Sequence, residues 1–278
     1  MKKIVTIQDI SCFGKCSLTV ALPIISAMGI ETAVIPTAVL STHTGGFAGY
    51  TFRDLTDDIP NIANHWQNLG IKFNALYTGY LGSEKQVKIV SDFFDNFRTN
   101  ENFTIVDPVL GDNGRFYDGF NENFAEKMAK LCGKADYIIP NMTEASFLLK
   151  IPYTESYDRA YIEEILRKLA GIGCKVPMLT GVRFDDSQQG AVAYNSEENK
   201  FYCSFGDNIA RSVHGTGDIF ASVFTGAVAL GKSLQQALDI AVNFTVDCIK
   251  ATQNYVDEMW YGSCFELCIP NLIKYINK

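Results

Sequence analysis

Short apolar segments that alternate with helical segments along the whole chain are the feature that most constrains its fold. Two of these segments, Thr104-Ile105-Val106 and Tyr137-Ile138-Ile139, are near-continuous apolar runs rich in β-branched residues. A strand that is apolar on both sides must be buried on both faces, which is typical of a parallel sheet covered by helices. The alternation therefore predicts an α/β fold, a doubly wound sheet with helices on both faces.

The predicted elements follow one another at short intervals. Strands are expected near residues 3–8, 32–39, 73–78, 103–109, 136–139, 176–180, 190–194 and 200–204. Helices are expected near residues 17–28, 84–97, 122–132, 143–149, 158–170, 218–230, 234–253 and 264–277. Ser83 and Ser233 each precede a glutamine with the spacing of a capping box. Gly29 and Gly231 stand where helices should end.

Composition limits the class of protein. A chain of 278 residues, 47% of them hydrophobic, can bury a substantial core, and no low-complexity tract or linker divides it. We therefore expect residues 1–278 to form a single domain. The net charge of −7 argues against partners such as nucleic acid or an anionic membrane. No apolar run approaches the ~18 residues of a membrane span, and the apolar start is too short for a signal peptide, so we expect a cytoplasmic protein.

Several familiar site patterns are missing from the sequence. Neither Cys12 with Cys16 nor Cys264 with Cys268 has a second close pair of Cys or His that would complete a zinc site. We expect the eight cysteines to be reduced and mostly buried thiols. There is no Walker-type phosphate loop, and no Gly-x-Gly-x-x-Gly motif follows the first strand. An ordinary P-loop enzyme or a dinucleotide-dependent dehydrogenase is therefore disfavoured.

The segment His214-Gly215-Thr216-Gly217-Asp218 is the strongest indication of chemistry. Its two glycines allow a tight turn with exposed N–H groups. The apolar positions that follow, 219, 220, 223, 224, 227 and 228, have helical spacing. The N-terminus of a helix favours an anion such as a phosphate, and Asp218 beside it can accept a proton from an attacking hydroxyl. This arrangement predicts a phosphotransferase.

Ligands of doubly wound sheets bind beyond the carboxyl ends of the strands, so motifs that follow strands are expected to converge. Asp107 ends one predicted strand, and the polar loop 113–119 after it can serve as a lid. Asn141 and Glu144 follow the next strand. The two are also compatible with plain helix capping, but carboxylates here can organise Mg²⁺ through water. Thr180 ends a further strand and can face a phosphate.

Motifs near the N-terminus are expected to meet a small substrate. They follow the first three strands and span residues 9–17, 40–47 and 78–82. Phe13, Phe47 and Tyr80 would suit a flat heteroaromatic ring. His43 is the histidine expected to touch a ligand. The turn that contains Ser17 can meet the substrate, with the alternative that Ser17 is no more than a cap of the helix that follows it.

Together these motifs resemble the pyridoxal kinase family of the ribokinase-like superfamily. The resemblance covers most of the chain and rests on residues 41–45, 78–80, 107–112, 140–144, Thr180 and 215–218. It implies a three-layer sandwich with a mostly parallel central sheet. It also implies ATP-dependent phosphorylation of the 5′-hydroxymethyl group of pyridoxal, pyridoxamine or pyridoxine, as in vitamin B6 salvage. A homodimer is implied as well, and a requirement for a monovalent cation is left open.

The resemblance assigns a role to each candidate residue. Asp218 would be the base, with the amides of Gly215, Thr216 and Gly217 stabilising the transferred phosphoryl group. The nucleotide side would comprise Asp107, Glu144, Asn141, Thr180 and the lid residue Tyr117. Asp107 and Glu144 would help to position Mg²⁺ there. The substrate side would comprise Ser11 or Asp9, Thr44, His43 and Tyr80. Asp9 departs from the pattern, because many family members have serine directly after the first strand's Ile-Gln, and Thr42 departs as well.

Three alternative functions remain. A hydroxymethylpyrimidine kinase of thiamine synthesis shares the fold, but that group usually has cysteine in place of Asp218. A sugar or nucleoside kinase is disfavoured because no inserted strands are expected between 32–39 and 73–78. A non-catalytic vitamin B6-binding protein would have no need of a base. The aspartate therefore favours the vitamin B6 kinase.

Overall fold

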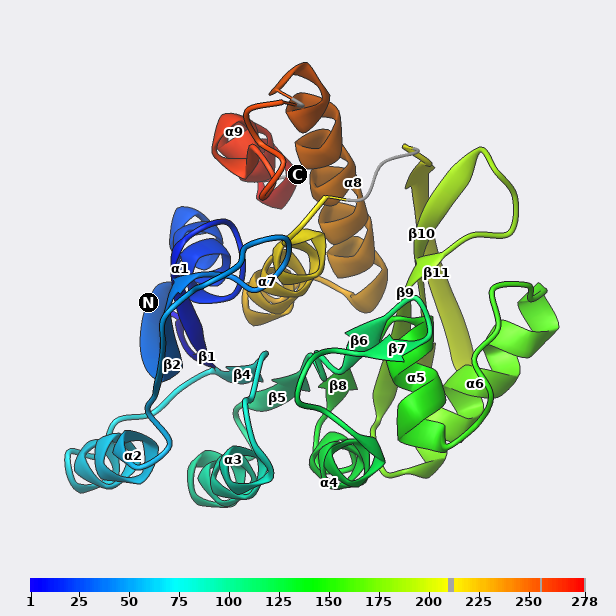
Figure 1. Ribbon diagram of the computed structural model, residues 1–278. Coiled ribbons are helices and arrows are strands. Elements are labelled where there is room, and N and C mark those ends of the chain that lie inside the picture. The colour runs from blue at the N-terminus through cyan, green and yellow to red at the C-terminus, as the bar shows by residue number, and fades with distance from the viewer. Residues whose placement is uncertain (210–212, 256, 278) are drawn as a thin grey trace.

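A nine-stranded sheet runs through the centre of the computed structural model, which describes residues 1–209, 213–255 and 257–277. The strand order is β11-β10-β9-β8-β5-β4-β1-β2-β3 (Figure 1). From β2 to β9, neighbouring strands are parallel; β3, β10 and β11 are antiparallel to their neighbours. These strands are β1 (Lys3–Phe13), β2 (Glu31–Thr42), β3 (Phe52–Asp54), β4 (Ala75–Thr78), β5 (Phe103–Val106), β8 (Tyr137–Ile138), β9 (Val176–Val182), β10 (Gln188–Asn195) and β11 (Lys200–Asp207). The mostly parallel α/β fold is confirmed.

Helices cover both faces of this sheet (Figure 1). One apolar core lies under α1 (Leu18–Ala27), α7 (Thr216–Ala229), α8 (Leu234–Thr252) and α9 (Phe265–Ile276). The other core lies under α2 (Asp58–Asn68), α3 (Glu84–Phe97), α4 (Glu122–Cys132), α5 (Met142–Leu149) and α6 (Arg159–Gly171). In the part of the chain that the structure describes, no helix has the length and hydropathy needed to cross a membrane.

Local capping signals place several helix ends as predicted. Ser233 and Gln236 form a complete capping box at the start of α8. Ser83 caps α3 through the backbone N–H of Gln86. The side chain of Gln86, however, donates to the carbonyl of Thr37 at 3.0 Å instead of closing the box. Because Thr37 lies on β2, this hydrogen bond fastens α3 to the sheet.

Three short strands were not expected from the sequence. β6 (Gly111–Asp112) and β7 (Arg115–Phe116) form a hairpin whose turn, Asn113-Gly114, has positive φ at both residues. Asn-Gly is the dipeptide that favours this turn, so the signal was present in the sequence. Along the chain, β3 lies between β2 and β4, so the expectation that no strand is inserted between these two segments was wrong. Three residues of β3 pair antiparallel with β2 at the edge of the sheet.

The parallel strands bring their carboxyl ends to the same edge of the sheet. There the pairing of β1 with β2 shifts register between Gln8 and Ile10. A bulge of this kind turns a side chain away from the regular alternation. Asp9 is the residue at this bulge. It therefore lies at the edge of the sheet where β4 ends at Thr78 and β5 ends at Val106.

Candidate active site

Carboxylates from separate predicted motifs interact at this edge. Asp9 lies on β1, Asp107 follows β5, Glu144 lies in the first turn of α5 and Asp218 lies in the first turn of α7. The charge of Asp9 raises the pKa of Asp218. The charges of Glu144 and Asp218 in turn raise the pKa of Asp107. The fold thus brings together acids that are up to 209 positions apart in the sequence (218 − 9).

The turn that precedes α7 is held tightly against the N-terminal loop. Gly215 has φ +81°, and a Cβ atom built on it would lie 2.0 Å from the carbonyl oxygen of Lys15. Ile219 N donates to Gly215 O at 2.9 Å, the first bond of the helix. The N–H groups of the residues between them therefore have no acceptor within the helix and remain available for an anion. Gly217 is exposed, and no protein atom would contact a Cβ atom there within 4 Å.

Asp218 is partly buried and has the protonation behaviour of a base. Desolvation by the surrounding protein, with the charge of Asp9, raises the pKa of Asp218 to about 7. A hydrogen bond from the backbone N–H of Ser17 acts in the opposite direction and lowers this pKa. A carboxylate whose pKa lies near neutrality can accept a proton and release it again under physiological conditions.

Asp107 and Glu144 form a second pair of buried acids. Burial raises the pKa of Asp107 well above its usual value, and the charges of Glu144 and Asp218 add to the shift. Burial likewise raises the pKa of Glu144 to about 7, although backbone N–H groups at Asn141 and Leu110 donate to it, each at 2.9 Å. These buried negative charges repel one another, which is the electrostatic setting that a divalent cation would relieve.

Mg²⁺ fits this pair of acids as a partial ligand set. Within residues 1–209, 213–255 and 257–277 no cluster of three or more His, Cys, Asp or Glu side chains forms a cage for a metal ion. Mg²⁺ usually keeps several waters and is bound by one or two carboxylates together with substrate phosphates. Both oxygens of Glu144 already accept backbone N–H groups. Asp107 is therefore the acid with more capacity for the ion or its waters.

The nucleotide-side candidates lie around the β6–β7 hairpin. Asn141 caps α5 in a capping box with Glu144, and its amide also donates to the carbonyl of Gly111 at 2.9 Å. Tyr117 follows the hairpin, and burial together with the charges of neighbouring acids, Glu144 first among them, raises its pKa. Thr180 lies near the end of β9 and is half-buried. The hairpin thus lies beside the acids, where the sequence predicts a lid.

The substrate-side candidates surround Asp9. Ser11 donates to a carboxylate oxygen of Asp9 at 3.0 Å, and the Ser17 hydroxyl also donates to it. Burial nevertheless raises the pKa of Asp9. Burial and the charge of Asp9 raise the pKa of Tyr80 to about 12. Ser11, Asp9 and Tyr80 are therefore together, as expected, whereas Thr44 is exposed in the loop after β2.

His43 connects two loops. Its Nε2 atom lies 2.7 Å from the carbonyl oxygen of Tyr261, and its Nδ1 atom accepts from the backbone N–H of Gly45 at 3.1 Å. The first contact requires a proton on Nε2 and the second a lone pair on Nδ1, so the ring is held as a neutral tautomer. Only the face and edge of the ring remain for contact with a ligand.

Aromatic rings gather next to His43, whose ring centroid lies 5.0 Å from that of Phe47. Phe13 and Phe47 pack edge to face with centroids 6.0 Å apart, while Tyr80 packs against Phe120. Trp260 and Tyr261 complete the group, with Trp260 4.7 Å from Phe47 and Tyr261 4.8 Å from Phe13. These two rings could not be predicted from the sequence, because nothing in the local pattern of 259–262 indicates that the loop reaches the first strands.

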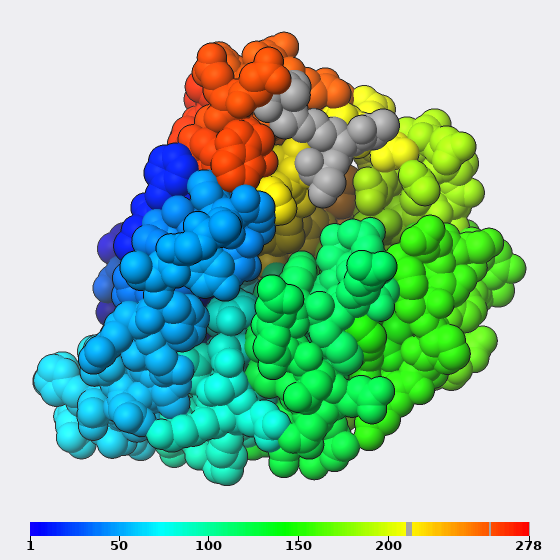
Figure 2. Space-filling model, in the orientation of Figure 1, coloured from blue at the N-terminus to red at the C-terminus, as the bar shows by residue number. Residues whose placement is uncertain are grey.

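The surface of the molecule is hollowed between the pale blue segment after β2, the green segment around the β6–β7 hairpin and the yellow start of α7 (Figure 2).

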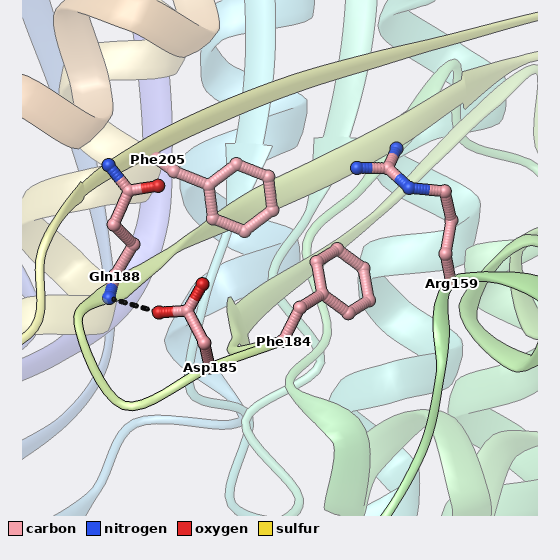
Figure 3. A pocket seen from close by; sticks show the side chains of 5 residues that line it. All are labelled: Arg159, Phe184, Asp185, Gln188 and Phe205. Carbon is pink, nitrogen blue, oxygen red and sulfur yellow. Dashed lines mark hydrogen bonds between the residues drawn. The ribbon is translucent and has the colours of Figure 1, made fainter.

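A separate pocket of roughly 190 Å³ lies between the start of α6 and the β9–β10 turn (Figure 3). Its ionisable side chains are already engaged: Arg159 lies 5.1 Å from the ring centroid of Phe184, and Asp185 accepts the N–H of Gln188. None of the candidate residues lines it.

Residues 22–261 match the family model of phosphomethylpyrimidine kinase, which is most of the chain. The chain belongs to the phosphomethylpyrimidine kinase family. This family consists of kinases, so the chain is a phosphotransferase. The match includes β2, β4, β5, the hairpin, α5 and the glycine turn before α7, and so contains most of the acids described above.

Individual members of the phosphomethylpyrimidine kinase family and related kinases align over nearly the whole chain. A Bacteroides thetaiotaomicron protein, described as a phosphomethylpyrimidine kinase and crystallised with pyridoxal, is 41% identical with a TM-score of 0.93 (98% of this chain, 95% of that one). The pyridoxal kinase of Lactobacillus plantarum is 28% identical with a TM-score of 0.91 (99% and 97%). The pyridoxal kinase of Dictyostelium discoideum is 26% identical over 276 residues (91% and 87%). The predicted resemblance to ribokinase-like pyridoxal kinases is confirmed.

Proposed function

We propose that this protein is an ATP-dependent vitamin B6 kinase, which phosphorylates the 5′-hydroxymethyl group of pyridoxal, pyridoxamine or pyridoxine. The observation that carries the proposal is the position of Asp218, an acid with a pKa of about 7 beside the open N–H groups at the start of α7. A relative that is 41% identical and was crystallised with pyridoxal supports this class of substrate.

In the proposed reaction, Asp218 accepts the proton of the hydroxymethyl group as its oxygen attacks the γ-phosphorus of ATP. A bond forms between that oxygen and phosphorus, the bond from phosphorus to the β–γ bridging oxygen breaks, and ADP leaves. The N–H groups of Gly215, Thr216 and Gly217 stabilise the charge on the transferred group. Positioning and electrostatics supply most of the acceleration in such reactions.

Asp107 would hold Mg²⁺, with Glu144 acting through water, while Asn141 and Thr180 line the nucleotide side. When bound, the ion neutralises phosphate oxygens of the nucleotide. Tyr117 and its hairpin would exclude water from the reacting groups and so limit hydrolysis of ATP. On the substrate side Asp9, Ser11, Thr44 and Tyr80 would orient the ring, with the His43 ring face beside them. A homodimer is part of this proposal.

Phosphorylation of hydroxymethylpyrimidine is the second candidate function, because the matched family model carries the name of that activity. A panel of pyridoxal, pyridoxamine, pyridoxine and hydroxymethylpyrimidine, assayed by consumption of ATP, separates the two. We expect turnover with at least one vitamer and less with the pyrimidine. Turnover with the pyrimidine alone would replace the proposal, and vitamer binding without ATP consumption would indicate a non-catalytic protein. Repeating the panel in Na⁺ and K⁺ tests the monovalent-cation requirement.

The proposed base predicts a pH dependence. Only the deprotonated form of Asp218 can accept the substrate proton, and its pKa lies at about 7. The value of kcat/KM should therefore be halved at about pH 7 and fall about tenfold for each pH unit below that, reaching a plateau on the alkaline side. The pH profile, measured with saturating Mg²⁺ and ATP, checks this. A flat profile between about pH 5 and 8 would exclude a base with this pKa.

The proposed metal site predicts opposite effects of one substitution on stability and activity. Burial and neighbouring charges raise the folded-state pKa of Asp107, so its charged form is disfavoured in the folded protein above the unfolded-state pKa. Asp107→Asn should therefore raise Tm at pH 8, while the Mg²⁺ concentration for half-maximal activity rises about tenfold or more. Thermal unfolding and a Mg²⁺ titration measure the two effects. An unchanged Mg²⁺ requirement would remove Asp107 from the metal site.

A further inference from the structure

Ser17 has a backbone conformation that serine rarely adopts. Its φ is 54° and its ψ is −128°, outside the regions open to residues with a side chain. Among the other described residues with a side chain, Val109, Asn113, Lys150 and Asn199 also have positive φ. Asn113 and Asn199 lie in turns between paired strands and Lys150 ends a helix. Val109, like Ser17, belongs to the candidate active site, where it follows Asp107 by two residues. Ser17 precedes a helix, where an extended backbone is usual. The conformation stores strain, and strain of this kind gathers at functional sites.

The hydroxyl group of Ser17 does not cap its helix. Ser17 stands at the N-cap position of α1, yet its side chain makes no capping hydrogen bond. Ser83 and Ser233, at the same position of α3 and α8, both accept the N–H three residues later. The alternative that Ser17 is no more than a cap is therefore wrong. Its hydroxyl group donates instead to the carboxylate of Asp9.

The backbone N–H of the same residue donates to the carboxylate of Asp218. Ser17 thus contacts both the proposed base and the acid on the substrate side. A backbone with ordinary φ would turn the N–H and the hydroxyl group to other directions. The strained conformation is therefore what allows one residue to hold two carboxylates.

The surrounding structure prevents this strain from relaxing. Ser17 is only 6% exposed and Asp9 only 5%. A β-bridge joins Ser17 to Ile10, and the carbonyl of Ser17 accepts the N–H groups of Val20 and Ala21 at 3.0 and 2.9 Å. These bonds fix the peptide groups on both sides of the residue.

We propose that Ser17 is a positioning residue for phosphoryl transfer, whose N–H orients Asp218 and whose hydroxyl group orients Asp9 toward the substrate. The inference rests on the proposed vitamin B6 kinase activity. The two contacts of Ser17 are expected to affect different kinetic constants: the contact with Asp9 affects KM, and the contact with Asp218 affects kcat. Loss of the hydroxyl group acts on substrate binding through Asp9, whereas the N–H toward Asp218 is kept in any variant that retains the backbone conformation.

Two substitutions separate positioning from structural support. Ser17→Gly and Ser17→Ala both remove the hydroxyl group, but only glycine adopts this φ and ψ without strain. Ser17→Gly should therefore have a Tm about 2–6 °C above that of Ser17→Ala. Both variants should show the same increase in KM for the vitamer, about tenfold, with kcat within about twofold of the wild type. Asn199→Gly, which relieves a positive φ on the distant β10–β11 turn, should change neither constant.

The measurements are steady-state kinetics with the preferred vitamer, and thermal unfolding of all three variants. A KM for Ser17→Gly equal to that of the wild type would overturn the proposal, as would KM values that follow Tm across the two Ser17 variants. Ser17→Gly alone decides the question if Ser17→Ala does not fold. Failure of the proposed function is distinguishable, because the wild-type protein would then show no vitamer-dependent consumption of ATP.

Discussion

Replacement of Asp218 by asparagine should lower turnover by about 10²–10⁴-fold, the usual contribution of a general base. Asparagine has nearly the same shape and can still accept the backbone N–H of Ser17 through its carbonyl oxygen. It cannot accept the proton of the substrate hydroxyl group. Because the substitution also removes a negative charge beside the proposed phosphate site, binding of ATP should be retained. Turnover is measured by consumption of ATP, and nucleotide binding by calorimetry.

Asp186→Asn is the matched control for this experiment. It removes the same charge from an exposed position on the turn between β9 and β10. Its turnover should equal that of the wild type. The decline of rate below about pH 7 should also be lost in Asp218→Asn, because that pH dependence comes from the pKa of Asp218. Wild-type turnover in Asp218→Asn would remove this residue from the role of base.

Replacement of Gly215 by alanine should damage both stability and activity. The added Cβ atom would lie 2.0 Å from the carbonyl oxygen of Lys15, so the backbone itself must shift. Lys15 cannot move freely, because its ammonium group pairs with Glu266 and lies 5.0 Å from the ring centroid of Phe265. The turn before α7 must then move away from the site. A displacement of about 1 Å can cost about 10²-fold in rate, and we expect at least that loss.

The cost of the clash can be separated from the cost of the backbone conformation. Gly231 has φ +84°, close to that of Gly215, but a Cβ atom there would meet nothing within 4 Å. Gly231→Ala should therefore lose only the roughly 1 kcal/mol of a left-handed residue. Gly215→Ala should lose about 1–3 kcal/mol more of unfolding free energy, measured by denaturant titration. Equal losses in the two variants would show that the contact with Lys15 is unimportant.

Local sequence patterns predicted most of the fold because they depend on neighbouring residues. The apolar run around Ile105 becomes a strand buried on both sides, and Ser233 caps α8 as its spacing indicates. The proximity of the carboxylates at 107, 144 and 218 could be predicted from the sequence, because parallel strands place their carboxyl ends at one edge of the sheet. The hairpin at Asn113 was missed although its dipeptide signal was present.

The sequence alone determined the order of the long strands and of every helix but α2, the ends of most of those helices and the side of the sheet that carries the acids; α2 and the short strands β3, β6 and β7 were not predicted. These follow from periodicity and capping, which act over a few residues. Only the tertiary structure decided that His43 binds the carbonyl of Tyr261, that Lys15 lies against Gly215 and that Ser17 faces two acids. Such contacts join residues that are remote in the chain or depend on a strained backbone, and packing of the two apolar cores on the sheet supplies the energy that holds them.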